Sequence, residues 1–142
     1  MKTTLKVKKN CCSNWYLIDA SNMILGRLAA KIAYVIQGKH KVTYRSCINH
    51  GDFIIIVNCE KVKLTGRKES NKRYWSHTGY VGGIKSMTVE KMRNLFPIRI
   101  IKKAVRGMLP KNALSRSVIK KLKIYKGQNH PHVAQKPLTI LN

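Results

Sequence analysis

Acidic residues are scarce in this chain of 142 residues. Five acids stand against 29 lysines and arginines, which gives a formal net charge of +24. Ion pairs within the protein cannot neutralise such an excess, and the remaining cations repel one another in dilute salt. The anions must therefore come from outside the chain. Nucleic acid is the favoured source, and an anionic membrane surface is the competing one.

Long apolar runs are also missing. The strongest run, Phe53 to Val57, has the length of a strand, whereas a membrane-spanning helix needs about 20 apolar residues. Residues 1–14 are basic but contain no apolar segment like that of a secretory signal. We therefore expect no membrane partner and interpret residues 1–14 as a basic N-terminal arm.

The four cysteines show no C-x-x-C spacing. Free thiols in a reducing cytosol are the favoured interpretation. Zinc is the alternative, because Cys47 and His50 could form one loose ligand pair that Cys59 or His130 completes. Structural zinc sites usually contain two tight ligand pairs, so we expect no metal site and no cofactor.

Catalytic motifs are absent as well. The five acids form no spaced carboxylate pair, and the chain contains no H-E-x-x-H, Walker A or G-x-S-x-G sequence. Phosphoryl-transfer enzymes usually need carboxylates to hold metal ions, and this chain has almost none to spare. His77 is the one candidate general base, although a phosphate or ribose contact suits it better. We expect no enzyme and no small-molecule substrate.

The first part of the chain predicts a strand–helix–strand unit. Residues 15–19 resemble a short buried strand, and Asp19, Ser21 and Asn22 offer turn and N-cap chemistry. Apolar residues recur on one helical face over 24–37, and Gly38 follows where a C-cap belongs. The continuous apolar run from Phe53 suits a strand that is covered on both faces, as in a parallel sheet. A right-handed βαβ unit is the firmest structural prediction.

The middle of the chain has weaker patterns. Residues 62–64 could form a further short strand, and 65–73 resemble a charged loop. Residues 74–85 mix aromatic residues, His77, Lys85 and glycines. They could be a turn-rich connection whose aromatics close the edge of the core. They could equally be a surface where backbone N–H groups approach phosphates and aromatics stack on bases or riboses.

Helices dominate the C-terminal part. Thr88 can cap one helix, and Pro97 ends it and opens the next, which runs towards Met108. A further helix is expected over 113–122, where Leu114, Val118 and Leu122 recur at four-residue spacing. Residues 123–127 could form a last strand. The chain is predicted to be one α/β domain over 15–127, followed by an extended tail over 128–142.

Residues 102–127 alternate a buried apolar stripe with dense cations and contain no acid. A segment of this kind is suited to a polyanion. The sequence shows no dimer-forming heptads, no C₂H₂ spacing and no clear helix-turn-helix, and its cations extend along the whole chain. Folded RNA is therefore the favoured partner. A DNA-compacting or regulatory nucleic-acid binder is the alternative.

Several sequence pieces resemble one protein family in order along the chain. They are WYLIDA (15–20), LGRLA (25–29), GKHK (38–41), GDFIIIVN (51–58), HTGYVGGIK (77–85), VRGMLPKNALSR (105–116), LKIYKG (122–127) and NHPHVAQKP (129–137). Together they resemble large-subunit ribosomal protein thirteen of the bacterial and organellar type.

The resemblance implies a single three-layer α/β/α domain on a small, mainly parallel sheet. It also implies a structural constituent of the large ribosomal subunit that binds large-subunit rRNA early in assembly, beside neighbouring large-subunit proteins. The expected location is the cytoplasmic ribosome of a bacterium, with an organellar ribosome as the alternative. No catalysis is attributed to the family.

We therefore expect a scaffold whose cations bridge separate rRNA helices, mainly through phosphate contacts. Each single lysine has the alternative role of a solvated surface charge, and the stem of Arg27 could simply pack on its helix. The predicted RNA-binding residues are Arg27, Lys39, His40, Lys41, Arg67, Lys68, Arg73, Tyr74, His77, Lys85, Arg106, Lys111, Arg116, Lys120, Lys121, Lys123, His130 and His132.

Overall fold

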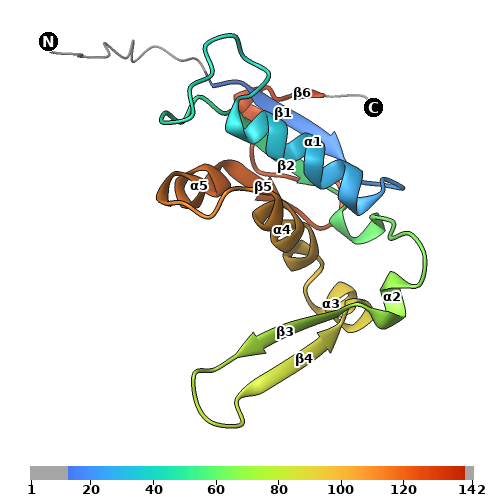
Figure 1. Ribbon diagram of the computed structural model, residues 1–142. Coiled ribbons are helices and arrows are strands. Elements are labelled where there is room, and N and C mark those ends of the chain that lie inside the picture. The colour runs from blue at the N-terminus through green and yellow to red at the C-terminus, as the bar shows by residue number, and fades with distance from the viewer. Residues whose placement is uncertain (1–12, 140–142) are drawn as a thin grey trace, which may run out of the picture.

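The computed structural model describes residues 13–139 of the chain (Figure 1). Strand β1 (Trp15–Asp19), helix α1 (Leu25–Gln37) and strand β2 (Phe53–Val57) follow one another. β1 and β2 pair in parallel, with Trp15 opposite Phe53 and Asp19 opposite Val57. The predicted βαβ arrangement with parallel strands is confirmed, and its right-handed crossover stays a prediction. Residues 1–12 of the expected basic arm, with Cys11 and Cys12, lie outside the described residues.

The main sheet has four parallel strands in the order β5-β2-β1-β6. Strand β5 (Leu122–Ile124) pairs with β2, and β6 (Leu138–Thr139) pairs with β1. The α/β class and the mainly parallel sheet are therefore as predicted. β6 has only two residues, too few for any periodic signal in the sequence.

One apolar cluster joins the sheet to two long helices. Ile54 and Ile56 of β2 are fully buried together with Ile32 of α1 and Ile101 of α4 (Pro97–Met108). α1 packs against α4 (Figure 1). Burial of each such side chain contributes about 1.5–3 kcal/mol to the free energy of folding. This cluster holds α4, the most basic long helix, in a fixed position.

The alternate residues of β1 and β2 lie on the opposite face of the sheet. Trp15 stacks on Phe53 with ring centroids 4.3 Å apart, and its indole lies 5.2 Å from the ring of His132. Ile55 is fully buried on this face. A short 3₁₀ helix, η3 (Val133–Gln135), follows His132. The C-terminal segment therefore packs against the sheet rather than leaving it.

The ends of α1 show one confirmed and one wrong prediction. Gly38 adopts a left-handed conformation with φ +79°, and a Cβ there would lie 2.9 Å from the His50 carbonyl carbon, so the glycine C-cap is confirmed. The N-cap is Ile24, which makes no side-chain capping bond. Asp19 instead accepts hydrogen bonds from the backbone N–H of Ser21 at 2.9 Å and from Asn58 Nδ2 at 2.9 Å. Asp19 therefore fixes the turn after β1. It lies too many residues before Leu25, the first residue of α1, to cap that helix.

The segment 62–64 does not form a strand. Lys63 makes only an isolated parallel bridge with Ile24, and its carbonyl accepts the N–H of Leu25 at 3.0 Å. This carbonyl satisfies the first free amide of α1 in place of a side-chain cap. A 3₁₀ helix, η1 (Cys59–Lys61), leads from β2 to this bridge.

A two-stranded hairpin projects from the main body (Figure 1). Its strands β3 (Arg73–His77) and β4 (Ile84–Thr88) pair antiparallel. Helix α2 (Lys68–Asn71) precedes it inside the segment that was expected to be a loop. Helix α3 (Val89–Leu95) follows, and the Thr88 hydroxyl accepts the N–H of Lys91 at 3.4 Å, so the predicted cap is confirmed.

The predicted helix over 113–122 is too long. Helix α5 (Ala113–Val118) is capped by Asn112, whose Oδ1 accepts the N–H of Ser115 at 2.8 Å. A 3₁₀ turn, η2 (Ile119–Lys121), follows, and Leu122 begins β5 opposite Ile54. Leu122 is still directed to the core, but from a strand. Pairing with β2 overrides the four-residue spacing.

Among residues 13–139, no helix is long and apolar enough to cross a membrane. Cys47 and Cys59 are free thiols, the first exposed and the second buried. Burial raises the pKa of Cys59 to about 11, and the neighbouring Glu60 carboxylate acts in the same direction.

The two thiols should react at different rates. In a Cys11→Ser/Cys12→Ser background, an alkylating reagent at mildly basic pH should label Cys47 in the native protein and both thiols after denaturation, because the reactive species is the thiolate. Mass spectrometry of the labelled protein measures this. Rapid native labelling of Cys59 would contradict the burial of this side chain at the start of η1.

Candidate nucleic-acid interface

An open groove of about 550 Å³ lies between α4 and α5. Its lining contains five cationic side chains and no acid. The cations are Lys102, Lys103, Arg106, Lys111 and Arg116. Cations on two helices and their connection form a surface that attracts a polyanion, and no acidic side chain in the lining competes with the polyanion for them.

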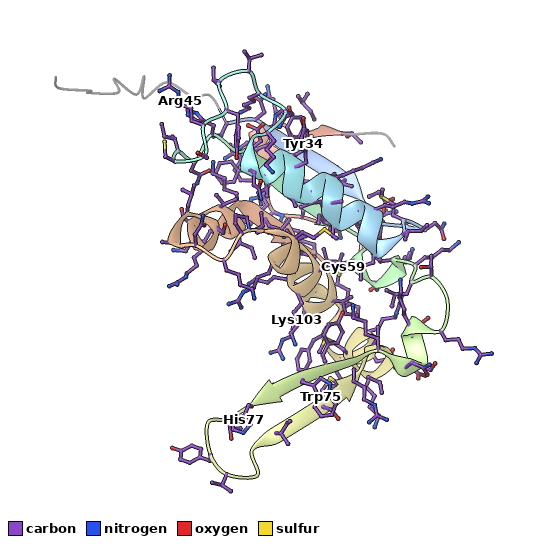
Figure 2. The ribbon with its side chains drawn as sticks, viewed as in Figure 1. Tyr34, Arg45, Cys59, Trp75, His77 and Lys103 are labelled. Atoms are coloured by element: carbon purple, nitrogen blue, oxygen red, sulfur yellow. The ribbon has the colours of Figure 1, made fainter. Side chains whose placement is uncertain are left out.

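The helical period of α4 explains which side chains reach the groove. Ile101 and Val105 are buried in the core, so Lys102 and Arg106, each one position further, are exposed on the solvent side of the helix. Lys103 Nζ lies 4.8 Å from the centre of the Tyr74 ring. Figure 2 shows Lys103 between α4 and the hairpin.

Leu109 and Pro110 produce the sharp connection between the two helices. Leu109 is buried, and Pro110 follows the end of α4. Asn112 then starts α5, which places Arg116 across the groove from α4. Arg106, Lys111 and Arg116, predicted from the sequence, are thus brought together. The predicted list missed Lys102 and Lys103, although the four-residue spacing from Lys102 to Arg106 could have indicated a shared face.

A second predicted group, in the loop after α1, is held inward by Asp52. The carboxylate of Asp52 is fully buried. Its Oδ1 accepts a hydrogen bond from the N–H of Asn14 at 2.8 Å and forms an ion pair with the ammonium of Lys41. Its Oδ2 lies 2.8 Å from Nε2 of His40. His40 and Lys41 therefore help to hold the loop, whereas Lys39 is exposed.

Lys121 supports the same region. Its ammonium donates to the carbonyl of Gly51 and lies 5.4 Å from the centre of the Phe53 ring. Burial lowers the pKa of Lys121, the Lys41 cation lowers it further, and Asp52 opposes both. Lys121 therefore supports the fold, and its predicted RNA contact stays a prediction. Lys120, next to it, is exposed.

In the hairpin, the predicted RNA-binding residue Tyr74 and the next residue, Trp75, differ in exposure. Tyr74 is partly buried against the core, and burial raises its pKa. Lys72 Nζ lies 5.4 Å from its ring centre. Trp75, in contrast, is 60% exposed. The predicted RNA-binding residues include Tyr74 but not Trp75, and strand alternation places the two side chains on opposite faces of the hairpin.

The other predicted residues are dispersed. Arg27 is exposed on α1, Arg67 and Lys68 surround the start of α2, and Lys123 is half-buried in β5. His132 Nε2 lies 2.7 Å from the hydroxyl of Tyr125, and His130 Nδ1 accepts the N–H of His132 at 3.3 Å. Within the described part of the chain, no three of His, Cys, Asp and Glu gather into a group that could hold a metal ion.

Comparison with known proteins identifies relatives over nearly the whole chain. A family model described as "Ribosomal protein L13" matches residues 13–131. A protein of Pelobacter propionicus named "Large ribosomal subunit protein uL13" is 51% identical over 137 residues, which cover 96% of each chain. Proteins of the same name from Nitratidesulfovibrio vulgaris (strain DSM 19637 / Miyazaki F) and Lawsonia intracellularis are 49% and 47% identical, over 96% and 99% of this chain and 95% and 97% of theirs.

Loss of the Asp52 charge should destabilise the fold. In Asp52→Asn, the ammonium of Lys41 loses a buried counter-charge, and breaking such a pair costs about 3 kcal/mol in the free energy of unfolding. Urea denaturation measures the change. The matched control is Glu90→Gln, which raises the net charge equally from an exposed position on α3. Equal stability of the two variants would contradict the role assigned to Asp52.

Proposed function

The chain belongs to the ribosomal protein L13 family, and from this premise we propose that it is a structural component of the large ribosomal subunit that binds large-subunit rRNA through the groove between α4 and α5. The observation that carries the proposal is the set of five cations in this groove without a single acid. A groove with this lining suits the phosphates of folded RNA, because they provide the negative charge that the chain lacks.

Phosphate contacts position a protein on RNA without reading its sequence directly. Arg106 and Arg116 present planar forks that can each hold two phosphate oxygens, whereas Lys102, Lys103 and Lys111 act as point charges. Because the groove is formed by two helices and a proline-containing turn, the backbone positions that carry these groups are fixed relative to one another. The protein thus acts as a scaffold that joins RNA segments, and no step of the proposal involves catalysis.

The relatives are bacterial proteins, which favours a bacterial cytoplasmic ribosome over an organellar one. We also propose contacts with neighbouring large-subunit proteins and binding early in subunit assembly. The exposed cations outside the groove, such as Arg27, Lys39 and Lys120, provide further phosphate contacts on the same RNA.

Single arginine substitutions in the groove should weaken RNA binding without unfolding the protein. Arg106→Ala and Arg116→Ala each remove a charged contact, so affinity for a large-subunit rRNA fragment should fall about tenfold. Filter binding measures the affinity, and circular dichroism checks the fold. Lys91→Ala is the control, because this exposed cation of α3 is outside the groove. An equal loss in all three variants would argue against a groove site.

RNA binding should depend steeply on salt. If about ten phosphates are neutralised, the logarithm of affinity should fall with a slope of roughly −7 to −9 per logarithm of salt concentration. Titration against the rRNA fragment at several salt concentrations gives the slope. A slope near −2 would contradict the distributed contacts, since it corresponds to about two or three phosphates. Equal affinity for random duplex DNA would favour a general nucleic-acid binder instead.

A further inference from the structure

The hairpin has two chemically different faces. Its register places Trp75 opposite Ser86, and side chains alternate between the faces along each strand. The inner face packs on the core cluster through Tyr74 and Met87. The outer face carries Arg73, Trp75, His77, Ile84, Ser86 and Thr88.

Trp75 is the centre of the outer face. Its side chain is 60% exposed although the indole is one of the largest apolar groups in the chain. Arg73 and His77 flank it along β3, and both are exposed. Across the strand pair it faces Ser86, whose small side chain leaves the indole uncovered. Figure 2 shows Trp75 and His77 on the hairpin, away from the helices of the main body.

The charge around Trp75 indicates the class of partner. Arg73 lies on the same face as Trp75, two residues before it along β3, and residues 72–88 contain no acid. Lys72 lies near the ring of Tyr74, and Lys85, opposite Ser76, alternates to the inner face. An exposed aromatic ring beside cations is the arrangement with which proteins hold unpaired nucleotides, because the ring stacks on a base and the cations contact the backbone. A protein partner would have to accept these cations with acids of its own.

The ring of His77 is fixed by its own turn. The N–H of Gly79 donates to Nδ1 of His77 at 2.9 Å. Nδ1 therefore carries no proton in this geometry, and the proton of the neutral imidazole is on Nε2. The residue offers a hydrogen-bond donor to a phosphate or a ribose hydroxyl without needing a positive charge.

We propose that the outer face of the hairpin binds an unpaired nucleotide of the RNA, whose base stacks on Trp75 while Arg73 and His77 contact its backbone. The inference rests on the proposed function, since it assumes an RNA partner. It adds a second kind of contact to that function. The groove between α4 and α5 holds phosphates of structured RNA, and the hairpin holds a base outside a helix.

The test uses the full chain with a short single-stranded oligoadenylate and an RNA duplex of the same nucleotide number as probes. The salt concentration is chosen so that duplex binding is weak. Oligoadenylate should quench tryptophan fluorescence more than the duplex does. Trp75→Phe should abolish the quenching, because the other tryptophan, Trp15, is stacked on Phe53. The same variant should keep the affinity. Phenylalanine retains an aromatic face for the base.

Non-aromatic substitutions should weaken binding. Trp75→Ala and Trp75→Leu should each lower the affinity for oligoadenylate roughly 5- to 100-fold, the range that corresponds to the loss of one base-stacking aromatic. Ile84→Ala is the matched control, because it removes another exposed apolar side chain from the same face. It should leave the affinity within about twofold of the unsubstituted protein.

Three outcomes would overturn the inference. If Trp75→Leu bound oligoadenylate like the unsubstituted protein, the affinity would not depend on stacking of a base on Trp75, and the inference would fail. If fluorescence and affinity were insensitive to Trp75 while Arg106→Ala still weakened binding of the rRNA fragment, the hairpin site would be refuted and the groove would stand. If neither substitution mattered for any RNA, the proposed function would fail as well.

Discussion

The shortage of counter-charge is the constraint on which this structure depends. With 29 lysines and arginines against five acids, few cations can be paired within the chain. Three of the five acids, Asp19, Asp52 and Glu69, hold segments together. Asp52 ties the loop after α1 to the sheet, and Glu69 of α2 pairs with Arg93 of α3 at 2.9 Å. Burial acts to raise the pKa of Asp19, but hydrogen bonds from Asn58 and Ser21 and the charge of Lys61 lower it, so this carboxylate stabilises its turn as an anion.

Arg93 shows how a cation becomes part of the fold. Its guanidinium donates to the carbonyls of Glu60 and Val62 at 2.9 and 2.8 Å, in addition to its pair with Glu69. Backbone carbonyls thus supplement the missing acids. The cations of the groove have no such arrangement of acids around them. The apolar cluster between the sheet, α1 and α4 holds the helix that carries three of them, so the core sustains the repulsion among these cations.

The local patterns that predicted the fold correctly were those with strong physical constraints. The run from Ile54 to Ile56 can be buried only as a central strand, and Gly38 occupies a conformation that few other residues adopt. The pattern failed where long-range pairing decides the outcome. Leu122 fits the helical spacing as well as it fits a strand, and only its pairing with Ile54 distinguishes the two. The two-residue strand β6 depends entirely on its neighbour β1.

The candidate site was predictable to a similar extent. The dense cations of α4 and α5 could be recognised from the sequence, and Arg106 and Arg116 do line one groove. The inward role of Lys41 could not be recognised, because its partner Asp52 becomes close only when the loop folds back. The hairpin register was needed to tell that Tyr74 faces the core and that Trp75 is exposed. The direct measurement of the central claim is the position of the protein in a sucrose gradient of a native lysate, with and without RNase. Sedimentation with large ribosomal subunits that RNase abolishes is predicted, whereas a protein found mainly in fractions free of large subunits and insensitive to RNase would contradict the account.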